Sequence, residues 1–102
     1  MGIFDFLKKN KNIENDNGLN EIYHNNGKGE IKLRCYKKNG KVEGVFKSYY
    51  ENGDLRGEGN LKNGKKDGVW KYYISNESLD GKEKWIELDN EVIFKNGKKV
   101  KN

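Results

Sequence analysis

One dipeptide, Asn-Gly, recurs along this chain and constrains how it can fold. It occurs at Asn26-Gly27, Asn39-Gly40, Asn52-Gly53, Asn63-Gly64 and Asn96-Gly97. Asn-Gly favours the tightest hairpin turns, because both residues tolerate a positive φ. The copies from Asn26-Gly27 to Asn63-Gly64 lie 13, 13 and 11 residues apart, which leaves room for one strand between successive turns. The spacing therefore predicts a meander of antiparallel hairpins.

The chain around two of these turns forms an internal repeat. Residues 39–47 and 63–71 align at an offset of 24, and eight of the nine columns are identical, similar or both polar; only Val42 against Lys66 departs. A tyrosine pair follows each copy, Tyr49-Tyr50 and then Tyr72-Tyr73, at an offset of 23. Such self-similarity is typical of repeat proteins, whose units stack on their neighbours. From residue 75 the pattern decays, and we expect a degenerate last unit.

Strand-like alternation runs between the turns, because successive side chains of a strand point to opposite faces. One face is predicted to hold Leu55, Gly57, Gly59 and Leu61, with Arg56, Glu58, Asn60 and Lys62 opposite. On the following strand Trp70, Tyr72 and Ile74 oppose Val69, Lys71 and Tyr73, and on an earlier one Ile31, Leu33 and Cys35 alternate with Lys32, Arg34 and Tyr36. We expect the bare Gly57 and Gly59 to leave a groove beneath Trp70 and Phe46.

The expected fold class is mainly β: a single-layer antiparallel meander of β-hairpins with a short N-terminal helix. Residues 1–10 are predicted to form that amphipathic helix, because Ile3, Phe6 and Leu7 share one helical face. Residues 11–22 are predicted to be a polar linker. Residues 23–102 are the hairpin repeat domain, with the degenerate unit at its C-terminal end.

The composition suits a thin sheet better than a thick core. Charged residues make up 36% of the chain and hydrophobic residues 32%, but the latter include six Tyr, four Phe and two Trp. Each aromatic side chain can bury roughly 150–250 Å². Aromatic contacts between strands can therefore stabilise a sheet with few aliphatic residues, and together with the regular glycines they argue against a disordered chain.

Charge is unevenly distributed, and the net charge of +5 permits acidic partners. Residues 28–71 carry ten Lys and two Arg against six acidic residues, residues 77–91 carry six acidic residues against two Lys, and residues 95–101 carry four Lys. The alternative is that the lysines only solvate the sheet edges and guard them against aggregation. Only two of the 21 basic residues are Arg, so we expect no specific nucleic-acid partner.

No group of residues indicates catalysis, and we predict that the protein is not an enzyme. His24, the one histidine, precedes a predicted turn, and Cys35, the one cysteine, falls on the apolar face of a strand. One Cys and one His cannot supply the ligands of a zinc site, and the glycine-rich stretches lack a phosphate-binding pattern. Neither metal nor cofactor is predicted. With no disulfide possible and no signal-peptide features at the start, a cytoplasmic location is expected.

Residues 49–73 resemble a full unit of the bacterial MORN-repeat variant family. The family pattern is roughly Tyr-Tyr-x-Asn-Gly, then Gly-x-x, then Asn-Gly-Lys-x-x-Gly-x-Trp-x-Tyr-Tyr. The match is specific over residues 36–74, weaker over 23–35 and fades over 75–99. The resemblance implies stacked antiparallel MORN-like hairpins in an elongated sheet. Many bacterial proteins with these units are labelled YwqK-type antitoxins or immunity-like partners, and MORN repeats elsewhere are credited with membrane and protein scaffolding.

Six aromatic residues form the candidate partner-binding site: Phe46, Tyr49, Tyr50, Trp70, Tyr72 and Tyr73. Both sides of a single-layer sheet contact water, and Tyr and Trp dominate many interfaces. The alternative is that both rows are structural repeat residues. We expect a non-catalytic protein-binding repeat module, and the resemblance implies an antitoxin or immunity type whose partner is another protein, such as a cognate toxin. The second hypothesis is a peripheral membrane-associated or scaffold module that binds anionic surfaces.

Overall fold

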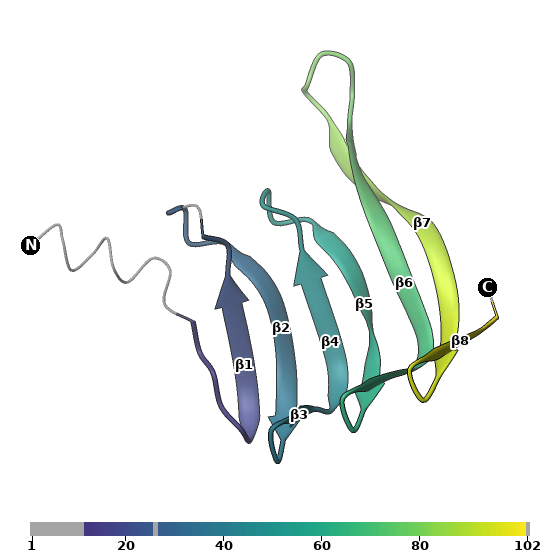
Figure 1. The fold of residues 1–102 in the computed structure, drawn as a ribbon. Helices are drawn as coiled ribbons and strands as arrows, with labels where there is room; N and C mark the ends of the chain where they lie inside the picture. Colours follow the sequence, from purple (N-terminus) through teal and green to yellow (C-terminus); the bar gives the residue numbers. More distant parts are fainter. Residues whose placement is uncertain (1–11, 26, 102) are drawn as a thin grey trace, which may run out of the picture.

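The computed structural model describes residues 12–25 and 27–101, which form one antiparallel sheet (Figure 1). The strands are β1 (Gly18–Tyr23), β2 (Ile31–Lys38), β3 (Lys41–Val42), β4 (Gly44–Tyr49), β5 (Leu55–Lys62), β6 (Lys65–Glu77), β7 (Lys84–Lys95) and β8 (Lys98–Lys101). Their order in the sheet follows the chain, except that the short β3 pairs with β2 beside β4. The predicted antiparallel meander is confirmed.

The sheet is a single layer. The described residues measure 50 × 43 × 13 Å, and strands that succeed one another in the chain lie side by side across it (Figure 1). No helix occurs among the residues described, and thus none that could span a membrane. The helix predicted for residues 1–10 lies outside the described residues.

Three of the Asn-Gly turns have the predicted conformation. Asn39, Asn63 and Asn96 have φ of 51°, 52° and 52°, and the glycine after each also has a positive φ, which is the signature of a type I′ hairpin. The turn at Asn52-Gly53 differs, since only Gly53 has a positive φ. There the Tyr50 N–H donates to the Asp54 carbonyl at 2.9 Å, which closes a longer loop.

Successive turns are also tied to one another along one edge of the sheet. The glycine N–H of each type I′ turn donates to a carbonyl in the preceding unit: Gly40 to Asp16, Gly64 to Val42 and Gly97 to Lys66, each at 2.9 Å. A two-residue turn leaves the N–H groups of both its residues unpaired within the hairpin, and these bonds use the second of them. The first is bonded as well at two turns, where Asn39 N–H donates to the Asn17 side chain and Asn63 N–H to the Glu43 side chain. The units are therefore stacked by the backbone as well as by side chains.

The polar linker predicted for residues 11–22 is wrong in its second half, because Gly18–Tyr23 form β1. The prediction failed because this strand carries a polar residue, Asn20, at a buried position. Asn20 is 2% exposed and pairs with Cys35 of β2. Its side chain accepts a hydrogen bond from the Asn15 N–H and donates to the carbonyls of Asn15 and Gly18. A buried polar residue that is fully hydrogen-bonded is stable but hides the alternation expected of a strand.

The core is correspondingly small. Among the described hydrophobic residues only Cys35, Trp70 and Val92 are buried, at 3%, 3% and 6% exposure. Burial also raises the pKa of the Cys35 thiol. Most other described apolar side chains are half-buried and the rest are exposed, as a single layer requires.

Two β-bulges move two basic residues from the sheet face predicted for them to the opposite face. Ile22 pairs with Leu33 and Tyr23 with Ile31, which leaves Lys32 unmatched. Ser48 pairs with Gly57 and Tyr49 with Leu55, which leaves Arg56 unmatched. A bulge re-aims the side chain of its extra residue. The alternation that placed Lys32 and Arg56 on the opposite face is therefore wrong, and both line a hollow shared with Leu33 and Gly57.

Beyond residue 72 the β6–β7 hairpin leaves the sheet. The β5 pairing ends at Tyr72 and the β8 pairing at Ile93, whereas β6 and β7 stay paired from Gly68↔Phe94 to Glu77↔Lys84. In Figure 1 this hairpin rises past the ends of the other strands. We call residues 74–88 the distal ribbon; they include most of the acidic segment 77–91, which the repeat pattern does not cover.

Candidate binding face

Trp70 is the centre of one face of the sheet. It comes from β6, and its indole lies against Gly59 of β5: a Cβ built on Gly59 would lie 2.2 Å from an indole carbon, which no side chain could tolerate. The Trp70 Nε1–H donates to the Asn60 carbonyl at 2.9 Å. The glycine groove predicted beneath Trp70 is confirmed, and it fixes the indole flat on the β5 backbone.

Other aromatic rings surround this indole. Phe46 of β4, which pairs with Gly59, has its ring centroid 5.7 Å from that of Trp70, and Tyr72 of β6 lies at 6.3 Å. Phe94 of β7 meets the indole edge-on at 6.5 Å. Such aromatic pairs contribute about 0.5–1.5 kcal/mol each beyond their buried area. We call Phe46, Trp70, Tyr72 and Phe94, with the side of the sheet that carries them, the aromatic face.

A lysine is enclosed by the same rings. The Lys66 Nζ lies 4.9 Å from the ring centroid of Trp70, 5.0 Å from that of Phe94 and 5.6 Å from that of Tyr72. It also donates to the Tyr72 hydroxyl at 3.0 Å. An ammonium over aromatic faces is stabilised by the ring quadrupoles, so the charge of Lys66 is held in place without a carboxylate.

A hollow of about 350 Å³ opens beside these rings. Its floor is apolar, formed mainly by Leu33, Phe46, Leu61, Trp70 and Tyr72, and its basic residues are Lys32, Arg56 and Lys66. No acidic residue lines it, and no carboxylate of the described chain forms an ion pair with these three side chains. The hollow therefore combines an apolar floor with three cations that form no ion pair with a carboxylate among the described residues.

The structure gathers only part of the predicted aromatic set in this site. Phe46, Trp70 and Tyr72 lie together on the aromatic face. Tyr73 faces the other side, where its hydroxyl donates to Glu58 at 2.7 Å, and that bond raises the pKa of the Tyr73 phenol. The Tyr50 hydroxyl donates to the Tyr73 carbonyl at 2.6 Å, so it supports the backbone. Tyr49 is half-buried at the β4 end, paired with Leu55.

Sequence reasoning missed Lys66 and Phe94. Lys66 stands in the one aligned column where the two repeat copies differ in kind, since the first copy has Val42 there. Because Val42 is apolar, the alignment indicated that the side chain at this position points toward the apolar side of the sheet. Phe94 comes from the degenerate unit, and only the pairing of Gly68 with Phe94 places it beside Trp70.

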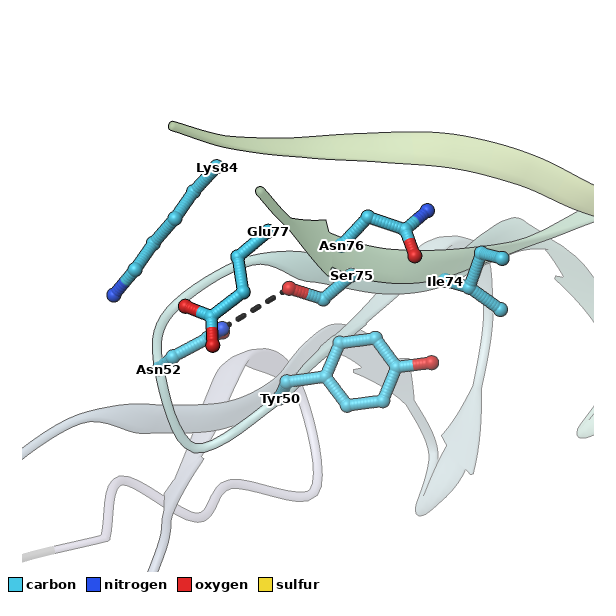
Figure 2. Close-up of a pocket in the computed structure, with 7 residues that line it drawn as sticks. All are labelled: Tyr50, Asn52, Ile74, Ser75, Asn76, Glu77 and Lys84. Atoms are coloured by element: carbon cyan, nitrogen blue, oxygen red, sulfur yellow. Dashed lines mark hydrogen bonds between the residues drawn. The ribbon is translucent and has the colours of Figure 1, made fainter. Parts of the chain in front are cut away.

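A second hollow lies between the β4–β5 turn and the distal ribbon, with a volume of about 510 Å³ (Figure 2). Tyr50 and Asn52 line one side of it and residues of the ribbon the other. The Asn52 amide donates to the Ser75 hydroxyl at 3.1 Å, and Ser75 in turn donates to Asp54. These bonds tie the turn to the ribbon, which makes this hollow a structural junction; it has no cluster of cations like that beside Trp70.

A row of lysines follows the edge that carries the type I′ turns. Lys38 pairs directly with Lys41, Lys62 with Lys65, and Lys95 with Lys98, and all six are exposed. Like charges placed directly opposite destabilise a sheet. The same unfavourable pair thus occurs at three equivalent turns, and we call these six residues the lysine edge.

The one histidine, His24, and the one cysteine, Cys35, have different surroundings. His24 Nε2 lies 3.1 Å from the Tyr49 carbonyl oxygen, while Cys35 is buried between β1 and β4. In the part of the chain that the structure describes, no three His, Cys, Asp or Glu side chains gather as a metal site would require.

Comparison with known proteins found no match to this chain. No protein-family model matches the chain, and neither a curated protein nor a solved structure matches it.

Proposed function

We propose that the protein is a non-catalytic binding module of the MORN-variant type that presents its aromatic face to a partner protein, in the manner of an antitoxin or immunity protein. The observation that carries the proposal is the hollow beside Trp70, where Lys32, Arg56 and Lys66 surround an apolar floor without a carboxylate. Well-packed aromatic and arginine residues supply most of the energy at protein interfaces. A partner that inserts acidic and apolar side chains would satisfy both parts of the hollow.

The test is binding to the protein encoded by the neighbouring gene. Co-purification and calorimetry should give a 1:1 complex, and co-expression should relieve any growth arrest which that neighbour causes. Arg56→Glu should weaken the complex by at least ~30-fold, the effect expected when a buried charge contact is reversed. Lys71→Glu, the same change of charge on the opposite face of the sheet, is the matched control and should bind normally. If the two variants bind equally, the aromatic face is not the interface.

The lysine edge favours a second candidate function, peripheral attachment to an anionic surface. Three repeated Lys–Lys pairs cost stability in the free protein, and a dense negative surface would remove that cost. A cluster of lysines gains about 1 kcal/mol per residue close to an anionic bilayer.

Sedimentation with phosphatidylserine vesicles tests this candidate. The wild-type chain should sediment at low salt and be released at high salt, because such attraction is screened. The triple variant Lys38→Gln, Lys62→Gln, Lys95→Gln should stay in solution, whereas Lys32→Gln, Lys47→Gln, Lys71→Gln, which removes the same charge away from the edge, should still sediment. Equal sedimentation of the two triple variants would remove the lysine edge from consideration.

A further inference from the structure

The distal ribbon exposes large apolar side chains that its own sheet cannot cover. On one face of the ribbon Trp85 is 44% exposed and Ile74 38%, and on the other face Ile86 is 40% exposed and Leu88 51%. A two-stranded ribbon is only marginally stable in water by itself. Exposed large apolar side chains that share a face, as Trp85 and Ile74 do, are typical of interaction surfaces.

One side of the ribbon also carries a carboxylate that is fixed in position. Ile74 pairs with Glu87 and Asn76 with Trp85, so these four side chains share a face. The Glu87 carboxylate accepts a hydrogen bond from Trp85 Nε1 at 2.8 Å and from the Asn76 amide at 3.0 Å. An indole and an oriented carboxylate are therefore presented together to solvent.

This pair matches the hollow of the aromatic face in chemistry. The hollow offers an apolar floor around Trp70 and the cations of Lys32, Arg56 and Lys66, whereas the ribbon offers Trp85 and Glu87. Residues 77–91, most of which belong to the ribbon, carry a net negative charge, whereas residues 28–71 carry a net positive charge. The ribbon thus presents a carboxylate and an indole, and the hollow presents the cations and the apolar floor that would bind them.

The two surfaces also follow the same side of strand β6 in the alternation of its residues. Along β6, Trp70, Tyr72, Ile74 and Asn76 alternate with residues of the opposite face, and the strand pairing places its bulge on β7, where Asp89 is unmatched, not on β6. Trp85 and Glu87 therefore lie on the side of the β6–β7 pair that carries Trp70 and Tyr72 nearer the sheet. A two-fold pair of identical chains needs both complementary patches on one side of the molecule.

We propose that two copies of this chain associate face to face about a two-fold axis, with Trp85 and Glu87 of each ribbon seated in the hollow of the other copy. Trp85 lies on the apolar floor, and the Glu87 carboxylate meets Arg56 and its neighbouring lysines. A reciprocal pair closes on itself, whereas a one-way contact would build an open chain. The pair covers the face at which the proposed function places a partner protein, so a second copy and that partner compete for it.

Sedimentation velocity on the full chain tests the pair without any partner protein. The wild-type chain should pass from monomer to dimer as its concentration rises. The dissociation constant should increase between about 0.01 M and about 1 M salt, over which the Debye length falls from about 30 Å to about 3 Å. Glu87→Lys and Arg56→Glu should each raise the dissociation constant by at least ~30-fold. Glu77→Lys, the same change on the opposite ribbon face, should leave it unchanged.

Mixing the two variants gives the decisive result. In a pair of Glu87→Lys with Arg56→Glu, the new lysine meets the new glutamate at one contact and the native Glu87 meets the native Arg56 at the other. The mixture should therefore form a heterodimer although each variant alone is monomeric. Circular dichroism and thermal melts confirm that both variants are folded. A monomeric wild-type chain at high concentration, equal weakening by Glu77→Lys, or a mixture that stays monomeric would overturn the proposal, and none of these outcomes bears on binding to a neighbouring gene product.

Discussion

The indole of Trp70 lies on the bare backbone of Gly59, closer than any side chain at position 59 would permit. This contact sets the position of the whole aromatic face, because Phe46, Tyr72 and Phe94 all pack around the same indole. It also explains why a sheet with three buried hydrophobic residues among those described can hold a defined shape.

Gly59→Ala should destabilise the protein by about 3 kcal/mol, the upper end for an overpacked core position. Its Cβ would overlap the rigid indole, which cannot move without losing its bond to Asn60. Gly57→Ala is the matched control: its Cβ would lie 3.2 Å from a carbon of the movable Tyr72 ring, so we expect a change within about 1 kcal/mol. Urea unfolding followed by tryptophan fluorescence measures both, and equal costs would contradict the role given to Gly59.

Gly64→Ala should cost about 1–2 kcal/mol, because position 64 has a φ of +79° and an L-residue is strained there. Asn63→Gly in the same turn should be nearly neutral, since glycine adopts the φ of 52° at that position as readily as asparagine. Thermal unfolding of the two variants compares them directly. A large loss from Asn63→Gly would mean that its side chain, not its backbone conformation, supports the turn.

The hydrogen bond from Tyr73 to Glu58 should be visible in a pH titration. That bond is the main cause that raises the pKa of the Tyr73 phenol, with burial next. A raised pKa in the folded state means that the contribution to stability is complete below the unfolded pKa of about 10 and is lost as pH rises through the folded value. Glu58→Gln should therefore shift one phenolate transition, followed by ultraviolet absorbance, to lower pH.

Tyr73→Phe provides the assignment for that titration, because it should remove the same late transition and leave the remaining tyrosines unchanged. The free energy of unfolding of this variant should decline less steeply above about pH 10, and the remaining decline includes the contribution of Tyr23, whose pKa is also raised, mainly by burial. If the late transition persists in Tyr73→Phe, another tyrosine is responsible for it.

Cys35 should react slowly with a thiol-specific disulfide reagent. It is 3% exposed and its pKa is raised by burial, and the thiolate is the reactive form. We expect labelling at least ~100-fold slower in the native protein than in denaturant, since it requires local opening. Asn20→Ala should speed labelling by ~10-fold or more, because Asn20 pairs with Cys35 and holds the chain that leads into β1. Asn76→Ala, on the distal ribbon, should have no effect.

Much of the architecture was predictable because it depends on local rules. Asn-Gly at regular intervals requires hairpins, and three of the turns take the conformation that the dipeptide favours. The alternation around Gly57 and Gly59 located the groove for Trp70. The first strand escaped prediction because Asn20 satisfies its hydrogen bonds within the chain and so occupies a place where an apolar residue was expected.

The sequence by itself determined the meander, its turns and the groove, because each depends on neighbours a few residues away and on a period of two along a strand. Tertiary structure alone decided which cations lie beside Trp70 and that Phe94 joins its rings. Two bulges turn Lys32 and Arg56 toward its hollow, and the pairing of β6 with β7 brings Phe94 to the rings that enclose Lys66. A bulge is a difference in register between two strands, and the ring cluster forms where side chains of three strands pack together. Neither feature can therefore be read from the residue spacing along a single strand.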